Sequence, residues 1–256
     1  MLSSATLLIF LLPVLEAVVP LAHASPILQS STSNEGRNRS PEFYEVVGSM
    51  VANSTADGHR SLQKRPSFST SQDGVNGAGF YFTLYNDNHA GATYTEYNSG
   101  QFQLGWTTSV EFLSGKGYKG QTPKTLTWSG YFSATGDYTM AVYGWTTNPV
   151  TEWYIVEQHG TGTSGNGDTL GHVDTDGGVY DVYDLFYQNV PEIYGVTSFH
   201  QYWSVRRSAR TTGSVTTGNH FQSWKNLGLD PGYSVFQVVT AEGFSGTGYL
   251  DFTVSY

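Results

Sequence analysis

The strongest constraint on the fold is the alternation of short apolar strands with turn-forming clusters from Gly79 to the C-terminus. Segments such as 101–106 and 249–254 place aromatic or aliphatic side chains at every second position, which is the period of a half-buried strand. The chain has 30 Gly, 18 Tyr, 14 Phe and 6 Trp, and aromatic side chains fit a pleated surface while glycines form its turns. The pattern predicts an all-β sandwich or barrel and argues against a helical bundle.

One stretch has the spacing of a helix. Phe221, Trp224 and Leu227 lie three residues apart, behind the turn-prone segment 217–219 and before Gly228, a suitable residue to follow a helix end. We expect one α-helix over this stretch, packed on a sheet through its three apolar residues.

Composition excludes several classes of function. The chain has 12 Lys and Arg against 21 Asp and Glu, a formal net charge of -9, and no basic run, so nucleic acid is not an expected partner. It has no cysteine, which excludes disulfides, thiolate metal sites and cysteine nucleophiles. Its histidines are scattered, with no His-x-x-x-His, and no Gly-x-Ser-x-Gly occurs. We therefore expect no metal, no cofactor and no serine hydrolase.

The N-terminus has the pattern of a targeting segment. Residues 6–15 form an apolar run too short to span a bilayer, and Ala22-His23-Ala24 is a small-x-small cleavage pattern. Residues 1–24 are therefore predicted to be a cleaved secretory signal peptide, and the mature protein to be secreted, extracellular and free of the membrane. Two prolines and a glutamate interrupt the run, which disfavours an uncleaved anchor.

The segment 25–65 is polar and rich in turn formers, and it ends in the dibasic pair Lys64-Arg65. It is predicted to be a removable pro-segment, or else a linker whose charged end has no processing role, because Pro66 disfavours many proteases. The remaining residues, 66–256, are the predicted catalytic domain, and they carry the whole net charge of the chain.

Two glutamates lie inside aromatic strands, where burying a carboxylate costs free energy and therefore indicates a functional role. Alternation places Glu152 on the same face as Tyr154, with Glu157 on the opposite face, and it places Glu242 on the face of Val238. If the two faces meet across an aromatic sheet, they form a pair of acids beneath stacking platforms, as in a glycosidase. The alternative from strand statistics is that each acid marks the solvent side of a half-buried sheet.

Separate motifs then give a specific resemblance. From about Phe80 to Tyr256 the chain resembles glycoside hydrolase family 11, the endo-1,4-β-xylanases, in the order and spacing of its motifs. That family implies a β-jelly roll of two strongly twisted antiparallel sheets with a single α-helix and a concave substrate cleft. The motifs are Tyr143-Gly144-Trp145, Asn148-Pro149, Glu152-x-Tyr154-Ile155-Val156-Glu157, Phe199-x-Gln201-Tyr202-Trp203-Ser204-Val205-Arg206, Asn219-His220-Phe221 and Glu242-Gly243.

The resemblance implies hydrolysis of internal β-1,4-xylosidic bonds of xylan by a retaining double displacement. Glu152 matches the nucleophile and Glu242 the general acid/base, and such a pair needs carboxyl groups ~5 Å apart. Glu242 must keep its proton while Glu152 is ionised. The expected partners are xylan and xylo-oligosaccharides, and the expected state is a monomer.

The family also implies the residues that contact substrate. Tyr143 and Tyr154 match tyrosines that orient the nucleophile and the reacting sugar. Trp145, Pro191 and Gln201 match substrate-contacting positions.

Several positions depart from the family pattern. Tyr85 stands where a Trp usually stacks on a xylose, Tyr187 where an Arg commonly lies, and Phe236 where a Tyr is frequent. The turn over residues 190–195 resembles the thumb, a hairpin that closes over the cleft, and carries Glu192 where Ser is usual. These changes affect subsite contacts and leave the catalytic pair intact.

Glu111 occupies a position where the family has Asn in alkaline-leaning members and Asp in acid-leaning ones. We hypothesise that Glu111 couples to Glu242 as a second carboxylate and gives an acidic activity optimum. The alternative is that its longer side chain points to solvent.

The sequence leaves two competing functions open. A β-glucanase of the related family 12 fits the two acids but not the Tyr-Trp-Ser-Val-Arg segment. A polysaccharide-binding or host-surface-recognition protein that has lost turnover is suggested by Tyr85, Tyr187 and Phe236, and the intact Glu152 and Glu242 argue against it.

Overall fold

The computed structural model describes residues 66–162 and 167–256. The predicted signal peptide, residues 1–24, and the predicted pro-segment, residues 25–65, lie outside these described residues. Within the described ranges, no helix is long and apolar enough to cross a membrane.

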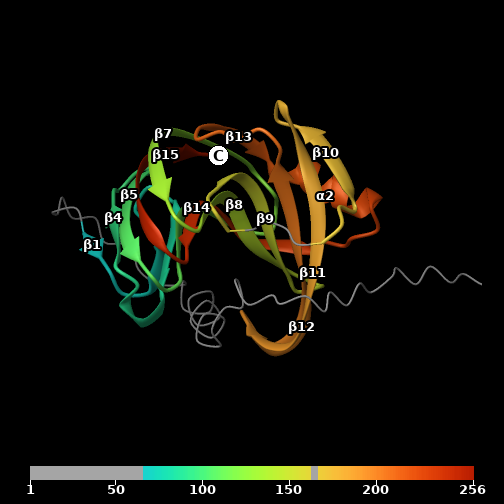
Figure 1. Ribbon diagram of the computed structural model, residues 1–256, viewed down its shortest axis with the longest axis horizontal. Helices are drawn as coiled ribbons and strands as arrows, with labels where there is room; N and C mark the ends of the chain where they lie inside the picture. Colours follow the sequence, from blue (N-terminus) through green and yellow to red (C-terminus); the bar gives the residue numbers. More distant parts are fainter. Residues whose placement is uncertain (1–65, 163–166) are drawn as a thin grey trace, which may run out of the picture. The chain divides into compact units, whose positions relative to one another are not determined.

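The described chain folds into two β-sheets, one of nine strands and one of six (Figure 1). All neighbouring strands are antiparallel except β12 and β9, which run parallel. In order across the nine-stranded sheet, the strands are β10 (Gly171–Thr175), β11 (Gly178–Glu192), β12 (Gly195–Arg206), β9 (Thr151–His159), β8 (Tyr138–Thr147), β14 (Tyr233–Gly243), β6 (Phe112–Lys119), β3 (Tyr81–Asn86) and β2 (Gln72–Val75).

The parallel pair is one exception in two sheets that are otherwise antiparallel, as expected. The chain leaves β9, makes the β10–β11 and β11–β12 hairpins, and returns β12 beside β9 in the same direction. In order across the six-stranded sheet, the strands are β1 (Ser67–Phe68), β4 (Ala92–Glu96), β5 (Gln101–Thr108), β15 (Gly246–Ser255), β7 (Thr125–Thr135) and β13 (Gly213–Thr216).

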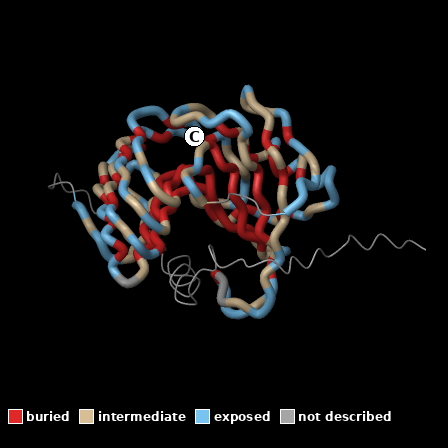
Figure 2. Tube along the Cα trace, in the orientation of Figure 1, coloured by how far each residue is buried: buried red, intermediate tan, exposed pale blue. Residues whose placement is uncertain are grey.

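A central core fills the space between the two sheets. Alternation in β5 and β15 points Phe102 and Leu104 inward opposite Phe252 and Leu250, and all four are fully buried. The same apolar cluster contains residues of the nine-stranded sheet, including Ile155. Figure 2 shows buried residues running along the neighbouring central strands. The two predicted alternating segments are therefore confirmed as strands, and the β-jelly roll as the fold.

A single α-helix, α2 (Thr217–Asn226), occurs in the described part of the chain, and a 3-10 turn, η1 (Asp87–His89), follows β3. Phe221 and Trp224 are buried, and their rings lie 5.3 and 6.3 Å from that of Trp153 in β9. The predicted helix and its packing on a sheet are confirmed at these positions.

The helix ends as a Schellman motif. Gly228 has φ +84°, its N–H donates to the Lys225 carbonyl, and the Leu229 N–H donates to the Trp224 carbonyl. The prediction that Gly228 follows the helix is confirmed. Leu227 was expected on the packed face, but it is the cap residue and is 37% exposed, because the helical spacing stops one residue before it.

A buried ion pair joins the two sheets. Lys116 of β6 donates to Glu96 of β4 at 2.7 Å and to the carbonyls of Tyr97, Ser99 and Gln101 at 2.8–3.0 Å. Burial lowers the pKa of Lys116, and the Glu96 charge opposes that shift. The Lys116 ammonium fixes the connection between β4 and β5 to the nine-stranded sheet, a contact that the sequence pattern did not indicate.

The other face of the nine-stranded sheet, turned away from the central core, is lined by aromatic and aliphatic side chains. We call it the aromatic face. Its buried members are Tyr81, Tyr85, Leu113, Ala141, Tyr143, Trp145, Tyr154, Val156, Ile193, Phe199, Trp203, Phe236 and Val238.

Candidate active site

The carboxylate of Glu152 is held on the aromatic face by three side chains. Its Oε1 accepts hydrogen bonds from the hydroxyls of Tyr143 at 2.8 Å and Tyr154 at 3.4 Å, and its Oε2 accepts one from the Gln201 amide at 2.6 Å. Hydrogen bonds to an ionised carboxylate are stronger than neutral ones. The arrangement therefore fixes the orientation of Glu152 and favours its charged form.

Strand register brings these four side chains together. Glu152 in β9 lies opposite Gln201 of β12 on one side and Trp145 of β8 on the other, and Tyr154 lies opposite Tyr143. Glu152 and Tyr154 are two residues apart and so share a face. The prediction that Glu152 and Tyr154 point the same way is confirmed.

The partners of Glu152 are oriented in turn by two tryptophans. The Trp145 indole N–H donates to the Tyr143 hydroxyl at 2.6 Å, so the hydroxyl proton is left to point at Glu152. The Trp203 indole N–H donates to Gln201 Oε1 at 2.8 Å, which turns the amide NH₂ toward Glu152. Each donor to the carboxylate therefore has a fixed direction.

Trp203 is a supporting residue to which the sequence analysis gave no role. Besides orienting Gln201, it stacks on Tyr154, with ring centroids 4.0 Å apart and planes 7° from parallel. The sequence does contain a signal for this role, because Trp203 follows Gln201 by two residues and so lies on the same face of β12.

Glu242 lies on the same face of the sheet as Glu152. In β14 it has the parity of Phe236 and Val238, which belong to the aromatic face, whereas its neighbour Ala241 belongs to the central core. The predicted grouping of Glu242 with Val238 is confirmed, and the side chain is buried.

Tyr85 and Glu111 lie near Glu242. Tyr85 of β3 and Glu242 of β14 lie on either side of Leu113 in β6, all three in one row across the sheet. Glu111 lies just before β6, two residues before Leu113, the register partner of Glu242, and its carbonyl accepts from the Asp87 N–H at 3.0 Å. Glu111 is 7% exposed, so its side chain does not extend into solvent.

The two glutamates enter the face at different levels. Glu152 lies opposite Trp145, whereas Glu242 lies opposite Thr139, six residues away on β8. An extended strand rises about 3.3 Å per residue, which separates the two levels by about 20 Å along β8.

Two departures from the family pattern extend the aromatic face. Tyr187 stacks on Phe199, with ring centroids 5.6 Å apart and planes 25° from parallel, and Phe199 contacts Trp145 at 5.1 Å. The ring of Phe236 lies 5.2 Å from Tyr81 and 6.0 Å from Tyr143. Tyr187 places an aromatic ring where a guanidinium is common, and Phe236 keeps a ring but lacks the hydroxyl.

The turn predicted as a thumb is the tip of the β11–β12 hairpin, where Pro191 pairs with Val196 and Glu192 with Gly195. The side chains of Pro191 and Glu192 lie outside what the structure describes, so substrate contact by Pro191 stays a prediction.

One perturbed carboxyl lies at the edge of the sheet. Burial raises the pKa of Asp73 in β2 to about 6, against the opposing effects of the Tyr81 hydroxyl and the Lys119 charge. Among residues 66–162 and 167–256, no three His, Asp or Glu side chains form a group that could hold a metal ion.

Two packed β-sheets with two glutamates on one aromatic face fit a glycoside hydrolase. The model of the glycosyl hydrolases family 11 matches residues 77–253. The chain belongs to this family, which removes the family 12 alternative.

Named relatives agree with this assignment. The chain is 41% identical over 185 residues to Ethylene-inducing xylanase 1 of Botryotinia fuckeliana, covering 72% of this chain and 66% of the relative. It is 37% identical over 195 residues to Endo-1,4-beta-xylanase 2 of Rhizopus oryzae, covering 76% and 89%. A solved structure from a comparison of two endo-1,4-β-xylanases from Trichoderma reesei matches with TM-score 0.62 and 34% identity, covering 75% of this chain and all of that one.

Proposed function

We propose that the protein is an endo-1,4-β-xylanase that cleaves internal bonds of xylan with net retention, with Glu152 as nucleophile and Glu242 as general acid/base. The observation that carries the proposal is the fixed carboxylate of Glu152, which accepts from Tyr143, Tyr154 and Gln201 on an aromatic face that also contains Glu242.

The reaction runs in two displacements. Glu152 attacks the anomeric carbon while Glu242 gives its proton to the leaving glycosidic oxygen, and the glycosidic bond breaks. The ester formed on Glu152 neutralises its charge, and Glu242, now ionised, takes a proton from water as that water attacks the same carbon. The second step releases Glu152 as the carboxylate and returns the proton to Glu242.

The hydrogen bonds to Glu152 fit a nucleophile rather than a proton donor. Three donors point at the carboxylate and stabilise its charged form. Tyr143 and Tyr154 orient the attacking oxygen, and Gln201 holds the other. Tyr85 and Trp145 are buried on the same face, and their contact with xylose units stays a prediction.

A retaining reaction sets a geometric demand on this site. The two carboxyl groups must come within ~5 Å of each other around the scissile bond, although their strand positions differ by six residues along β8. The side chains must therefore lean toward each other over a curved sheet, and the long strands of this sheet curve along their length in Figure 1.

The wider setting of the enzyme is part of the proposal. We expect a secreted monomer whose signal peptide ends near Ala24, whose residues 25–65 precede the catalytic domain, and whose catalytic domain begins at Pro66. N-terminal sequencing of the secreted protein tests the two processing sites: mature chains that begin at Ser25 or Pro66 support them, and an intact Met1 contradicts them.

The activity test uses the full chain on unbranched xylan beside its Glu152→Gln variant. Reducing ends and product lengths are followed over time. Short xylo-oligosaccharides from the parent alone support the proposed function and nucleophile together. Retained xylan binding without turnover by the parent overturns it and favours the binding-protein alternative.

A further inference from the structure

We propose that Lys119, at one end of the aromatic face, binds the carboxylate of a uronic acid side group on xylan, so that the enzyme favours xylan that carries such groups. The inference rests on the proposed function, which gives xylan as substrate, and it specifies the kind of side group. A uronic acid is a sugar with one carboxyl group, and a carboxyl group is ionised at neutral pH.

Lys119 lies on the aromatic face in the same row as the proposed nucleophile. It is the register partner of Phe236 in β14, and Phe236 is the register partner of Trp145 in β8. Trp145 in turn lies opposite Glu152 in β9. The Lys119 Nζ lies 5.5 Å from the centroid of the Tyr81 ring, which belongs to the same face.

The row sets the distance between Lys119 and the reaction. Neighbouring strands lie about 4.8 Å apart, so three strand steps place Lys119 about 14 Å from Glu152 along the sheet. A xylan chain that extends from Glu152 across these strands therefore brings its side groups to Lys119.

Lys119 is the lysine that a strand presents on this face. Within the described strands of the nine-stranded sheet, Lys and Arg occur only at positions 116, 119 and 206. Lys116 joins the six-stranded sheet, and Arg206 donates to a tyrosine of the central core. Arg207, just beyond β12, is bound to Asp181 at 2.7 Å. Because the proposed catalytic groups on this face are acids, an anionic side group is repelled near them and attracted at Lys119.

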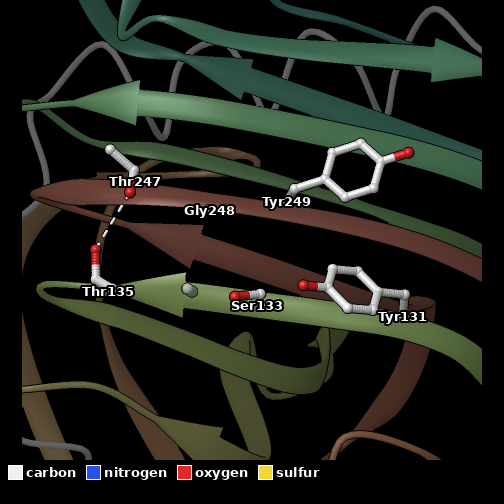
Figure 3. A pocket seen from close by; sticks show the side chains of 7 residues that line it. Tyr131, Ser133, Thr135, Thr247, Gly248 and Tyr249 are labelled. Carbon is white, nitrogen blue, oxygen red and sulfur yellow. Dashed lines mark hydrogen bonds between the residues drawn. The ribbon is translucent and has the colours of Figure 1, made fainter.

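The strands of the six-stranded sheet offer no cation for this purpose. In the described part of the chain they contain neither Lys nor Arg. The shallow depression between β7 and β15 is lined by tyrosines, hydroxyls and small side chains without a charge (Figure 3). A carboxylate on the substrate therefore finds its charged partner at Lys119.

Asp73 competes for the Lys119 ammonium. It lies in β2 opposite Thr83 of β3. Thr83 has the parity of Tyr81 and Tyr85, which belong to the aromatic face, so Asp73 faces the same way. The Tyr81 hydroxyl donates to the Asp73 carboxyl, and the charges of Asp73 and Lys119 attract each other. Within the described ranges, the Oδ2 atom of Asp73 is buried without a hydrogen-bond partner.

This competition depends on pH. Burial raises the pKa of Asp73 to about 6, against the opposing effects of Tyr81 in β3 and Lys119 in β6, the titratable side chains that act on it. As the pH falls through about 6, Asp73 takes up a proton and stops attracting Lys119. A uronic acid, with an ordinary carboxyl pKa of about 4, stays ionised there.

The substrate carboxylate then replaces Asp73 beside the ammonium. Burial lowers the pKa of Lys119, and a neighbouring negative charge opposes that shift, so the Lys119 cation is stabilised by a carboxylate next to it. The preference for acidic xylan is therefore stronger below pH 6 than above it.

The test compares two polymers that differ in the carboxyl group alone: a glucuronoxylan, and the same glucuronoxylan after chemical reduction of its carboxyls to hydroxymethyl groups. The full chain is assayed at pH 5 and pH 7.5, and the ratio of kcat/KM on the acidic polymer to that on the reduced polymer is taken at each pH. Titration of the catalytic acids and any general loss of activity cancel in this ratio. We expect a ratio of about three at pH 5, the effect of a partly exposed ion pair, and about one at pH 7.5.

Variants assign the effect to Lys119. Lys119→Gln removes the charge and should bring the ratio at pH 5 to about one, whereas Lys119→Arg should keep it. Asp73→Asn should raise the ratio at pH 7.5 to its value at pH 5, because an amide does not ionise. Lys124→Gln is the matched control and should keep the parental ratio, because Lys124 also lies over a tyrosine ring, that of Tyr118 at 5.0 Å, but away from the aromatic face.

A parental ratio of one or less at pH 5 overturns the proposal, as does an equal ratio in the parent and Lys119→Gln. Inhibition by polygalacturonate that Lys119→Gln relieves also overturns it, because it would show a site for any polyanion. Failure of the proposed function would instead show as no turnover of either polymer by the parent. Gel retardation by the two polymers then compares the parent with Lys119→Gln, and stronger retardation by the acidic polymer in the parent alone would still support the lysine site.

Discussion

At the scale of single residues, the direction of each proton around Glu152 is set by a second partner. The Tyr143 hydroxyl accepts from Trp145 and donates to Glu152, and the Gln201 amide is turned by Trp203. A site prepared in this way does not have to reorganise during the reaction.

Tyr143→Phe removes one hydrogen bond to the Glu152 carboxylate and keeps the ring. A bond to a charged group contributes about 1.5–3 kcal/mol, so kcat/KM on xylan should fall about 10- to 100-fold. Steady-state kinetics measure the effect, with Tyr233→Phe, an exposed tyrosine, as the matched control. Equal activity of the two variants would show that the Tyr143 hydroxyl has no role.

Glu111→Asn tests the acidic pair. Glu111 lies two residues before the register partner of Glu242 and is buried, and an amide neither ionises nor shares a proton with a neighbouring carboxyl. The acidic limb of the pH-rate profile should move to higher pH, while Glu111→Asp should leave it in place. An acidic limb unmoved by Glu111→Asn would remove the coupling hypothesis.

His220 should weaken the fold in acid. Burial lowers its pKa to about 3, with Arg210 and Arg206 acting in the same direction. In the unfolded chain it titrates near 6.5, so between these values only the unfolded state binds the proton. The free energy of unfolding therefore falls as the pH drops from about 6.5 to 3.

His220→Phe keeps a ring against Tyr180 and removes that titration. Urea midpoints measured from pH 7 to pH 3 should decline less steeply in this variant than in the parent. His159→Phe, at an exposed position, is expected to retain the parental slope. An identical decline in His220→Phe would show that other groups govern acid stability.

At the scale of elements, β6 contributes to both faces of the nine-stranded sheet. Leu113 lies in the row of Glu242, and Lys116 points the other way to join the six-stranded sheet. The strand that pairs with the proposed acid/base, Glu242, is thus anchored by the buried ion pair with Glu96.

Lys116→Met should destabilise the fold by about 3–5 kcal/mol, because it leaves the Glu96 carboxylate buried without its cation. Chemical denaturation measures the change. Lys225→Met, on the exposed side of α2, should stay within about 0.5 kcal/mol of the parent. Adding Glu96→Gln to Lys116→Met should recover part of the loss. Equal stability of both lysine variants would contradict this role of the ion pair.

Local patterns predicted the elements well and their pairing poorly. Alternation and the position of Gly228 were sufficient for β5, β15 and the end of α2. The parallel β12–β9 pair depends on the path of the chain through two intervening hairpins. The Lys116–Glu96 contact depends on how two sheets pack. Neither this contact nor the parallel strand pair leaves a local pattern in the sequence.

At the scale of the whole molecule, the packing of two sheets leaves one outward face for each sheet, and the two faces differ in chemistry. The aromatic face of the nine-stranded sheet contains the acids, whereas the outer face of the six-stranded sheet is neutral and rich in hydroxyls. The faces of Glu152, Tyr154 and Glu242 followed from parity alone. The hydrogen bonds from Trp145 and Trp203 did not, because they depend on side-chain direction.

The central claim is that Glu152 forms a covalent intermediate with retention. The most direct measurement is incubation of the full chain with a 2-fluoro-xylobioside that has a good leaving group, followed by mass spectrometry of the intact protein and of its peptides. The account predicts one added fluoro-xylobiosyl unit, located on Glu152 and absent in Glu152→Gln. A label on another residue, or turnover of xylan to inverted products with no adduct, would contradict it.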